Sequence, residues 1–267
     1  MDTLFLVALT ACVVLMRGGY ADEPFCSGNF AGQLLNLEKS LSDVTDRLKH
    51  VEYTYNRHAN LLSHPPSSIT TLLRAADLEK GGWRLVFRAT SGNGQNVHDA
   101  WLTGAGTTDT KPDDMSRTYS NHFRVADVEN VWKAMAPRYA KVGLYRDNRE
   151  VAYVVFDAKD SDLKSWFAKD RVLDASWSDL TASGFYNVFS VDGSVSKYYT
   201  RTFLINSAYG GCPKDLGHLA VVEKMGSCEW DTHPAYPQFL YADLNHSDLW
   251  EKQRFGRADF FAIFASA

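Results

Sequence analysis

Apolar or large residues recur in alternating steps of four and three along residues 30–62, which is the 3.5-residue repeat of a left-handed coiled coil. The a positions are Leu34, Leu41, Leu48, Tyr55 and Leu62, and the d positions are Phe30, Leu37, Val44, Val51 and His58. Leucine at a with valine at two d positions favours three or four strands. The flanking positions are polar, so the narrow stripe predicts a helix that pairs with copies of itself over residues 22–64. A helix docked on its own domain usually shows a wider stripe and is the alternative interpretation.

Pro65 and Pro66 end this helical pattern, and residues 65–80 are predicted to be a linker. From residue 81 to residue 267 the pattern changes to short runs rich in β-branched and aromatic residues, which are typical of strands. Residues 83–89 and 257–265 are predicted to be the first and last strands. We expect hairpins turning at Asp147-Asn148 and at Asp192-Gly193, and short helices at 126–135 and 161–170. The predicted fold class is therefore α+β, with an N-terminal coiled-coil helix followed by a predominantly antiparallel β-rich globular domain.

The chain begins with an apolar run from Leu4 to Met16, followed by Arg17 and small residues. Its length is typical of a signal peptide, and we expect cleavage after Ala21; a signal anchor is the alternative. The mature protein is then expected to be secreted and extracellular. Removing Asp2 and Arg17 leaves the net charge of −4 unchanged. This balance, without a basic cluster, argues against a nucleic-acid partner.

Cys12 would leave with the signal peptide, so three cysteines remain in an oxidising compartment. Cys212 and Cys228 are close in sequence and are predicted to form a disulfide bond, which would stabilise the fold by roughly 3 kcal/mol. Cys26 is left over just ahead of the coiled coil. We expect it to form an interchain disulfide, with a bond back to the globular part as the alternative.

Catalytic signatures such as a nucleophile elbow, a zinc-protease helix, a phosphate-binding loop or a dinucleotide-binding fingerprint do not occur in the sequence. Three histidines, His98, His122 and His233, are candidate general bases, but isolated histidines are more often structural. Cys212, His218 and Cys228 lack the spacing of a zinc site. The sequence therefore favours a protein that is not an enzyme.

Two acidic clusters have the oxygen ligands that calcium prefers, although neither has the glycine and terminal glutamate of an EF-hand loop. The first contains Asp109, Asp113 and Asp114, and the second contains Asp157, Asp160 and Asp162. Calcium at Asp109, Asp113 and Asp114 is a hypothesis, and a solvated acidic loop is the alternative.

Aromatic residues in polar surroundings suit sugar stacking or partner binding, although most such residues belong to a core. These residues are Trp101, Tyr209, Trp230, Tyr236, Tyr241 and Trp250. Asn245 lies in the one N-glycosylation sequon, NHS, and is a candidate glycosylation site.

Two segments, GGWRLVFRATSGNGQNVHDAW at residues 81–101 and YGGCPKD at residues 209–215, resemble the heads of fibrinogen-related lectins of the ficolin-like or intelectin-like kind. The resemblance implies a pocket for acetylated sugars beside the Cys212–Cys228 bridge, with calcium nearby. The chain departs from that family in lacking its earlier cysteine pair, in the longer spacing of the later pair and in its C-terminal FGRADFFAIF. More loosely, the chain resembles secreted invertebrate proteins of mineralised or adhesive matrices.

These features predict a secreted homo-oligomer, a trimer or tetramer, whose heads bind an extracellular ligand, preferably a glycan. The coiled coil would add avidity, because later contacts form at high effective concentration. The alternative is a structural component of an extracellular or mineralised matrix that has no small-molecule ligand.

Overall fold

The structure is a computed structural model that describes residues 40–41, 82–114, 117–147 and 149–266. The chain divides into two units, Met1–Thr71 and Leu72–Ala267. Ser40 and Leu41 of the first unit are helical, and Leu41 is exposed. The predicted signal peptide, the predicted linker, Cys26 and the other positions of the predicted coiled coil lie outside the described residues.

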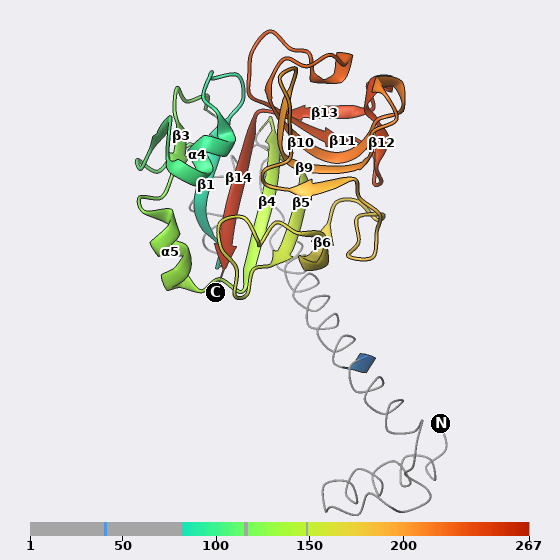
Figure 1. Ribbon diagram of the computed structural model, residues 1–267. Helices are drawn as coiled ribbons and strands as arrows, with labels where there is room; N and C mark the ends of the chain where they lie inside the picture. Colours follow the sequence, from blue (N-terminus) through green and yellow to red (C-terminus); the bar gives the residue numbers. More distant parts are fainter. Residues whose placement is uncertain (1–39, 42–81, 115–116, 148, 267) are drawn as a thin grey trace, which may run out of the picture. The chain divides into compact units, whose positions relative to one another are not determined.

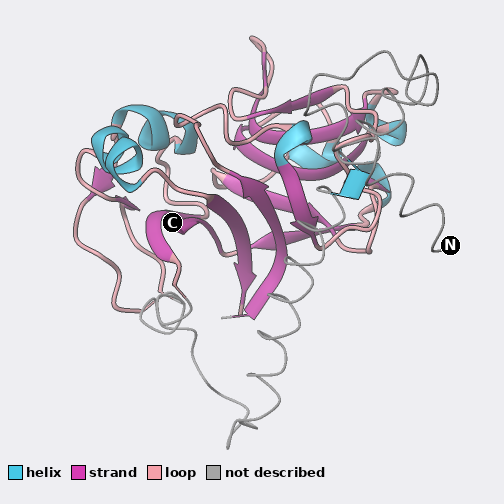
Figure 2. Ribbon diagram, turned by 90° about the horizontal axis from the view of Figure 1, so that it is seen from below, coloured by secondary structure: helices cyan, strands magenta, loops and turns pink. Residues whose placement is uncertain are grey.

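The second unit contains two seven-stranded sheets, which we call sheet A and sheet B (Figures 1 and 2). In spatial order, sheet A consists of β2 (Thr107–Thr108), β3 (His122–Arg124), β1 (Arg84–Thr90), β14 (Phe260–Ser266), β4 (Tyr139–Arg146), β5 (Arg149–Asp157) and β6 (Val172–Ala175). The first and last strands of the unit, β1 and β14, pair with each other in the middle of this sheet, which confirms both predicted strands.

Sheet B has a main path of five strands and two short additions. It consists of β13 (Phe255–Ala258), β11 (Gln238–Ala242), β10 (Leu216–Lys224), β9 (Thr200–Ala208) and β7 (Val188–Ser190), with β12 (Asp248–Leu249) on β10 and β8 (Ser194–Val195) on β9. Among the described strands, all pairs are antiparallel apart from β2 with β3. The predicted antiparallel β-rich domain is therefore confirmed.

Short helices connect the strands. They are α4 (Val97–Thr103), α5 (Val128–Met135) and the 3₁₀ turns η1 (Lys169–Arg171), η2 (Cys212–Lys214), η3 (Glu229–Asp231) and η4 (Trp250–Lys252). The α5 helix lies within the predicted range 126–135. Sequence reasoning missed α4, which begins after Asn96, whose side chain accepts a hydrogen bond from the Asp99 amide, and ends at Gly104 in the left-handed conformation.

The helix predicted at 161–170 is wrong, because this segment forms turns that end in η1. The Leu163 carbonyl oxygen accepts hydrogen bonds from the indole nitrogens of Trp101, at 2.7 Å, and Trp166, at 3.0 Å. The Asp162 carboxylate accepts the amides of the next turn. Side chains thus take up backbone groups that a helix would have used.

One predicted hairpin is confirmed and the other is wrong. Strands β4 and β5 pair from Arg146 opposite Arg149, as the turn at residues 147–148 requires. By contrast, β7 and β8 both pair with β9, so Asp192-Gly193 interrupts one side of this ladder, and the tight turn lies at residues 196–199. Gly193 has a φ of +65°, and a Cβ there would collide with the backbone of β9. Glycine at this position therefore serves a close approach of strands rather than a hairpin turn.

The core follows the two-residue period of the strands. In β14, Phe261, Ile263 and Ala265 belong to the main apolar cluster, whereas Phe260, Ala262 and Phe264 belong to a cluster on the opposite face. Phe261 lies 5.0 Å from Phe203 of sheet B, between ring centroids, so the two sheets pack face to face. A third cluster covers the other face of sheet B, which we call its outer face, and includes Trp230 and Trp250.

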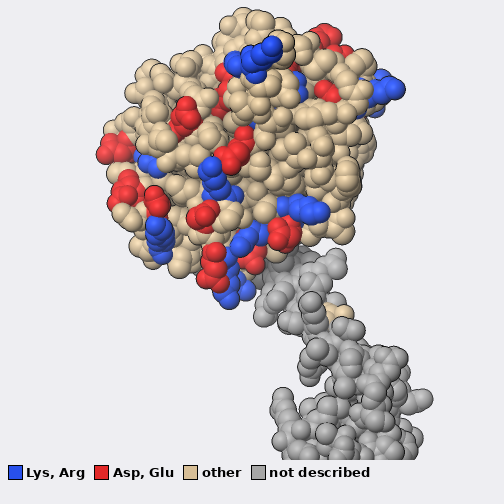
Figure 3. All heavy atoms as spheres, viewed as in Figure 1, with Lys and Arg blue, Asp and Glu red and all other residues tan. Residues whose placement is uncertain are grey.

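Every helix in the described part of the chain is too short or too polar to cross a lipid bilayer. Figure 3 shows acidic and basic side chains interspersed over the visible face of the described domain. A long-range field of one sign is therefore not a feature of this face, and charge recognition depends on local groups.

Candidate binding site

Two tryptophans anchor turns η3 and η4 to the outer face of sheet B. Trp230 and Trp250 are fully buried, and their ring centroids are 4.6 Å apart. The Trp230 indole nitrogen donates to the Asp215 carboxylate at 3.2 Å, and that of Trp250 donates to the Gly217 carbonyl at 2.9 Å. The turns are therefore fixed against β10 by packing and by satisfied polar groups.

A disulfide bond fixes the same region. Cys212 of η2 and Cys228, which precedes η3, are bonded with their Cα atoms 5.4 Å apart, which confirms the predicted pair. Asp215 approaches both sulfur atoms, and Cys212, Asp215 and Cys228 form the one group of three ligand-type side chains in the described residues. Because the two sulfurs are bonded to each other, they offer no thiolate, and the group does not fit a metal ion.

An ion pair lies beneath η3. The guanidinium of Arg201, on β9, donates to the Asp231 carboxylate, with Nε at 3.0 Å, and both side chains are buried. The same guanidinium stacks on Tyr199 and Trp230, each at 4.1 Å from the ring centroid. Burial alone would lower the pKa of Arg201, and its contacts with Tyr209 and Asp231 raise the pKa overall. This arginine is a paired, structural charge.

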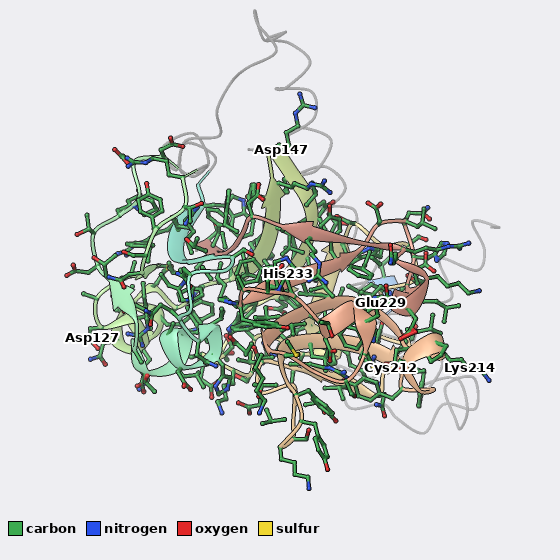
Figure 4. All side chains as sticks on the ribbon, turned by 90° about the horizontal axis from the view of Figure 1, so that it is seen from above. Asp127, Asp147, Cys212, Lys214, Glu229 and His233 are labelled. Carbon is green, nitrogen blue, oxygen red and sulfur yellow. A yellow bond between two sulfur atoms is a disulfide. The ribbon has the colours of Figure 1, made fainter. Side chains whose placement is uncertain are left out.

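A groove of about 560 Å³ follows β13, the edge strand of sheet B. Its lining comes from the β4–β5 turn, from η3 and its exit, and from the end of η4 with β13. The lining residues are Arg146, Glu229, Thr232, Gln253, Phe255, Gly256 and Arg257. In Figure 4, Glu229 marks the η3 side of this region and Asp147 marks the tip of the β4–β5 hairpin. Gly256 is required because a Cβ there would collide with the Tyr241 ring.

Arg257 is the partly buried cation of the groove. Its Nη2 donates to the carbonyl oxygens of Trp230, at 3.0 Å, and Thr232, at 3.5 Å, and its Nη1 lies 3.4 Å from the Gln238 amide oxygen. Burial lowers the pKa of Arg257, against weaker raising effects of Tyr236 and Asp231. Among the described residues, no carboxylate forms an ion pair with it.

Arg146 supplies a second cation from the end of β4. A hydrogen bond with the Tyr241 hydroxyl raises the pKa of Arg146. Its nearest carboxylate oxygen belongs to Asp147, 3.9 Å from Nε, and both side chains are mostly exposed. Such a pair contributes little energy and leaves the guanidinium able to contact a ligand.

The remaining polar lining is neutral or acidic. The Glu229 carboxylate accepts a hydrogen bond from the Gln253 amide at 2.8 Å, and both residues are exposed. The Thr232 hydroxyl donates to the Cys228 carbonyl oxygen at 2.9 Å. Phe255 also lines the groove and packs partly against the outer cluster of sheet B. The groove thus combines donors, acceptors and one aromatic ring.

The three histidines considered as bases are engaged in structural contacts and do not come together. His122 is fully buried, where its Nδ1 accepts the Thr90 amide and its Nε2 donates to the Gln95 carbonyl, each at 3.1 Å. Burial lowers the pKa of His122 to about 4, so the ring is neutral at pH 7.

The other two histidines hold loops. His98 Nε2 lies 2.8 Å from the Asp192 carboxylate, and His233 Nδ1 accepts the Ala235 amide at 3.2 Å. Neither lines the groove along β13. The prediction that the chain is not an enzyme stays a prediction.

The acidic clusters are not gathered into ligand sets in the described residues. The Asp113 carboxylate accepts the Tyr119 hydroxyl at 3.1 Å, while Asp109 is exposed, and Asp114 contributes its backbone carbonyl to Tyr119. In the second cluster, Asp157 and Asp162 accept nearby backbone amides. The calcium hypothesis stays untested.

The aromatic residues noted in the sequence are mainly core. Four of them, Trp101, Trp230, Tyr241 and Trp250, are buried, and Tyr209 and Tyr236 are partly buried. Asn245 is exposed in the loop between β11 and β12, and its sequon partner Ser247 donates its hydroxyl to Asp179 at 2.7 Å. Glycosylation of Asn245 stays a prediction.

Sequence reasoning missed the groove residues Arg146, Glu229, Gln253 and Arg257. They come from three separate parts of the chain, and no spacing links them. The one local signal is the alternation in Phe255, Gly256 and Arg257, where a charged residue shares a strand face with an aromatic one. Comparison with family models, curated proteins and solved structures finds no match to this chain.

Proposed function

We propose that the chain is a secreted, oligomeric binding protein whose globular unit takes up an extracellular ligand, preferably a glycan, in the groove along β13. The observation that carries the proposal is the composition of this groove. Two arginines, a glutamate, an amide and a hydroxyl line the groove together with a phenylalanine ring on the edge strand β13. Sugars present hydroxyl groups and an apolar ring face, which such a surface complements.

The rigidity of the support favours binding. The disulfide bond and the buried tryptophans of η3 and η4 fix the turns that line the groove. Side chains held in this way lose little conformational entropy when a ligand binds.

Assembly through the N-terminal segment would make weak single-site binding effective. The heptad pattern of residues 30–62 favours three or four copies, and each copy would carry one groove. Extracellular glycans present repeated epitopes, and an exported oligomer with several grooves contacts several of them at once. Export, assembly and glycan binding therefore form one proposal.

A glycan array probed with the full mature chain tests the proposal. The matched variant carries Leu34→Glu, Leu41→Glu and Leu48→Glu, which should dissociate the coiled coil without touching the groove. We expect the full chain to bind a set of glycans and the variant to lose apparent affinity by about 100-fold or more. Incorporation into an insoluble matrix without inhibition by any sugar would instead support the structural alternative.

A further inference from the structure

We infer that the groove along β13 selects an acidic sugar, and that the Arg257 guanidinium binds its carboxylate or sulfate group. This inference rests on the proposed function and narrows the ligand class. Three observations carry it: the uncompensated charge of Arg257, the position of Arg146, and the polar and aromatic surroundings.

Arg257 carries a positive charge that the described residues do not neutralise. A guanidinium has five N–H donors, and those of Arg257 contact two backbone carbonyls and one amide oxygen. Two N–H groups are left for a ligand. A partly buried cation with neutral partners gains more from an anion than an exposed cation does, because the local dielectric is lower than that of water.

The orientation of Arg257 is already set. Its contacts with the Trp230 and Thr232 carbonyls hold the planar guanidinium at the wall of the groove, 5.2 Å from the Phe255 ring centroid. The free N–H groups of a guanidinium fixed in this way, one on Nε and one on Nη1, can each donate a charge-assisted hydrogen bond to an oxygen of a carboxylate or of a sulfate ester.

Arg146 adds a second positive charge to the groove, although its own side chain is mostly exposed. It reaches the groove from the β4–β5 turn, where its nearest acid, Asp147, is 90 % exposed in its side chain. The charged residues that line the groove are Arg146, Arg257 and Glu229, so the lining itself carries one net positive charge, while Asp147 and Asp259 lie outside the lining near Arg146. Charge complementarity therefore favours an anionic ligand here.

The rest of the lining suits a sugar rather than a free inorganic ion. The Phe255 ring offers an apolar face, and Glu229, Gln253 and Thr232 offer hydrogen-bonding groups at the rim. An anion alone would use only the arginines, whereas an acidic sugar would use the arginines and the rim.

The test is calorimetric titration of the full mature chain with matched methyl glycosides: a neutral hexose, its uronate, its sulfate ester, and free sodium sulfate. We expect the uronate or the sulfate ester to bind at least about tenfold more tightly than the neutral sugar, which is the effect of one charge-assisted contact. The two acidic arms distinguish carboxylate from sulfate.

Three variants locate the effect. Arg257→Gln should reduce affinity for the acidic sugar about tenfold or more and leave affinity for the neutral sugar within about twofold. Arg146→Gln should also reduce affinity for the acidic sugar, but by a smaller factor. Because Arg146 is exposed, this result does not depend on whether the Arg257 variant folds. Arg254→Gln is the matched control, since Arg254 lies three residues from Arg257, is exposed and does not line the groove. It should change neither affinity.

The outcomes separate the two levels of the proposal. Equal binding of neutral and acidic sugars, unchanged in the Arg257 and Arg146 variants, would overturn the inference and leave glycan binding intact. Free sulfate bound as tightly as the sulfate ester would overturn it as well, because the sugar would then contribute nothing. Absence of binding to every sugar on the array and in the titration would overturn both the inference and the proposed function.

Discussion

Arg201 and Arg257 lie on strands of the same sheet and both contact turn η3, yet they are in opposite electrostatic situations. Arg201 is buried against the Asp231 carboxylate, whereas Arg257 contacts the Trp230 and Thr232 backbone carbonyls, which flank that aspartate. The pKa is raised at Arg201, where contacts with Tyr209 and Asp231 outweigh burial, and it is lowered at Arg257, where burial dominates. A difference of one carboxylate separates a structural cation from one that is available to a ligand.

His122 shows why this difference matters for an arginine. His122 is fully buried and Arg257 partly buried, each without an acidic partner, and burial lowers the pKa of His122 to about 4. The imidazole responds by losing its proton, and its neutral form satisfies both ring nitrogens. A guanidinium does not lose its proton at physiological pH, so at Arg257 the charge persists and favours a counter-ion.

The largest expected effect comes from removing the partner of Arg201. Asp231→Asn leaves a buried guanidinium without its counter-charge and should lower the free energy of unfolding by about 3–5 kcal/mol. Urea denaturation followed by tryptophan fluorescence measures this value. A loss below about 1 kcal/mol would mean that the pair contributes little and that the two arginines are not distinct.

The second effect concerns the turn that both arginines contact. Replacing Cys212 and Cys228 together by serine should cost roughly 3 kcal/mol, as expected for a loop closed over 16 residues. The matched control is the wild-type chain after reduction and alkylation, which should lose a similar amount. If neither form loses stability, the packing of Trp230 and Trp250 fixes η3 without help from the bridge.

The third effect is the pH dependence set by His122. Its folded pKa of about 4 lies below the unfolded value of about 6.5, so its contribution is fully present above pH 6.5 and is lost as the pH falls toward 4. Between pH 7 and pH 4 this contribution should fall by about 3 kcal/mol. His122→Gln, measured across the same range, should lose less stability than the wild type. Equal pH slopes in the two proteins would contradict the assignment.

Arg257→Gln is expected to have the smallest effect on stability, and it completes the comparison between Arg201 and Arg257. Loss of its bonds to two backbone carbonyls should cost about 1 kcal/mol, far less than loss of Asp231. Arg254→Gln, which loses only a long contact of 3.9 Å with the Asp248 carboxylate, should stay within about 1 kcal/mol of the wild type. A cost of 3 kcal/mol or more for Arg257→Gln would make this residue a structural cation like Arg201.

Local sequence signals identified the strands that build the centre of the fold. The apolar runs at residues 83–89 and 257–265 became β1 and β14, and the hairpin at residues 147–148 and the helix α5 were also found. In these segments the local pattern and the tertiary structure agree. Where the local pattern and the structure disagree, a tertiary contact explains the difference. Two tryptophans donate to the Leu163 carbonyl in the segment predicted to be a helix, and Gly193 allows an irregular strand pairing instead of a hairpin turn.

The site was harder to predict for a physical reason. A disulfide between cysteines 16 residues apart is a local feature, and it was predicted correctly. The groove depends on which turn meets the edge of β13, and a single sequence does not encode that contact as a spacing. Arg257 differs from Arg201 in lacking a carboxylate partner, and no spacing in the sequence indicates this difference.

The ligand-induced shift in melting temperature is the direct test of whether Arg257 binds the ligand, because it separates the stability of Arg257→Gln from its binding. The full mature chain and this variant are heated with and without an excess of the acidic glycoside that binds the wild type. We expect nearly equal melting temperatures without ligand, a rise for the wild type with ligand, and little or no rise for the variant. An equal rise in both proteins would contradict the account, since binding would then not depend on the one partly buried cation of the groove.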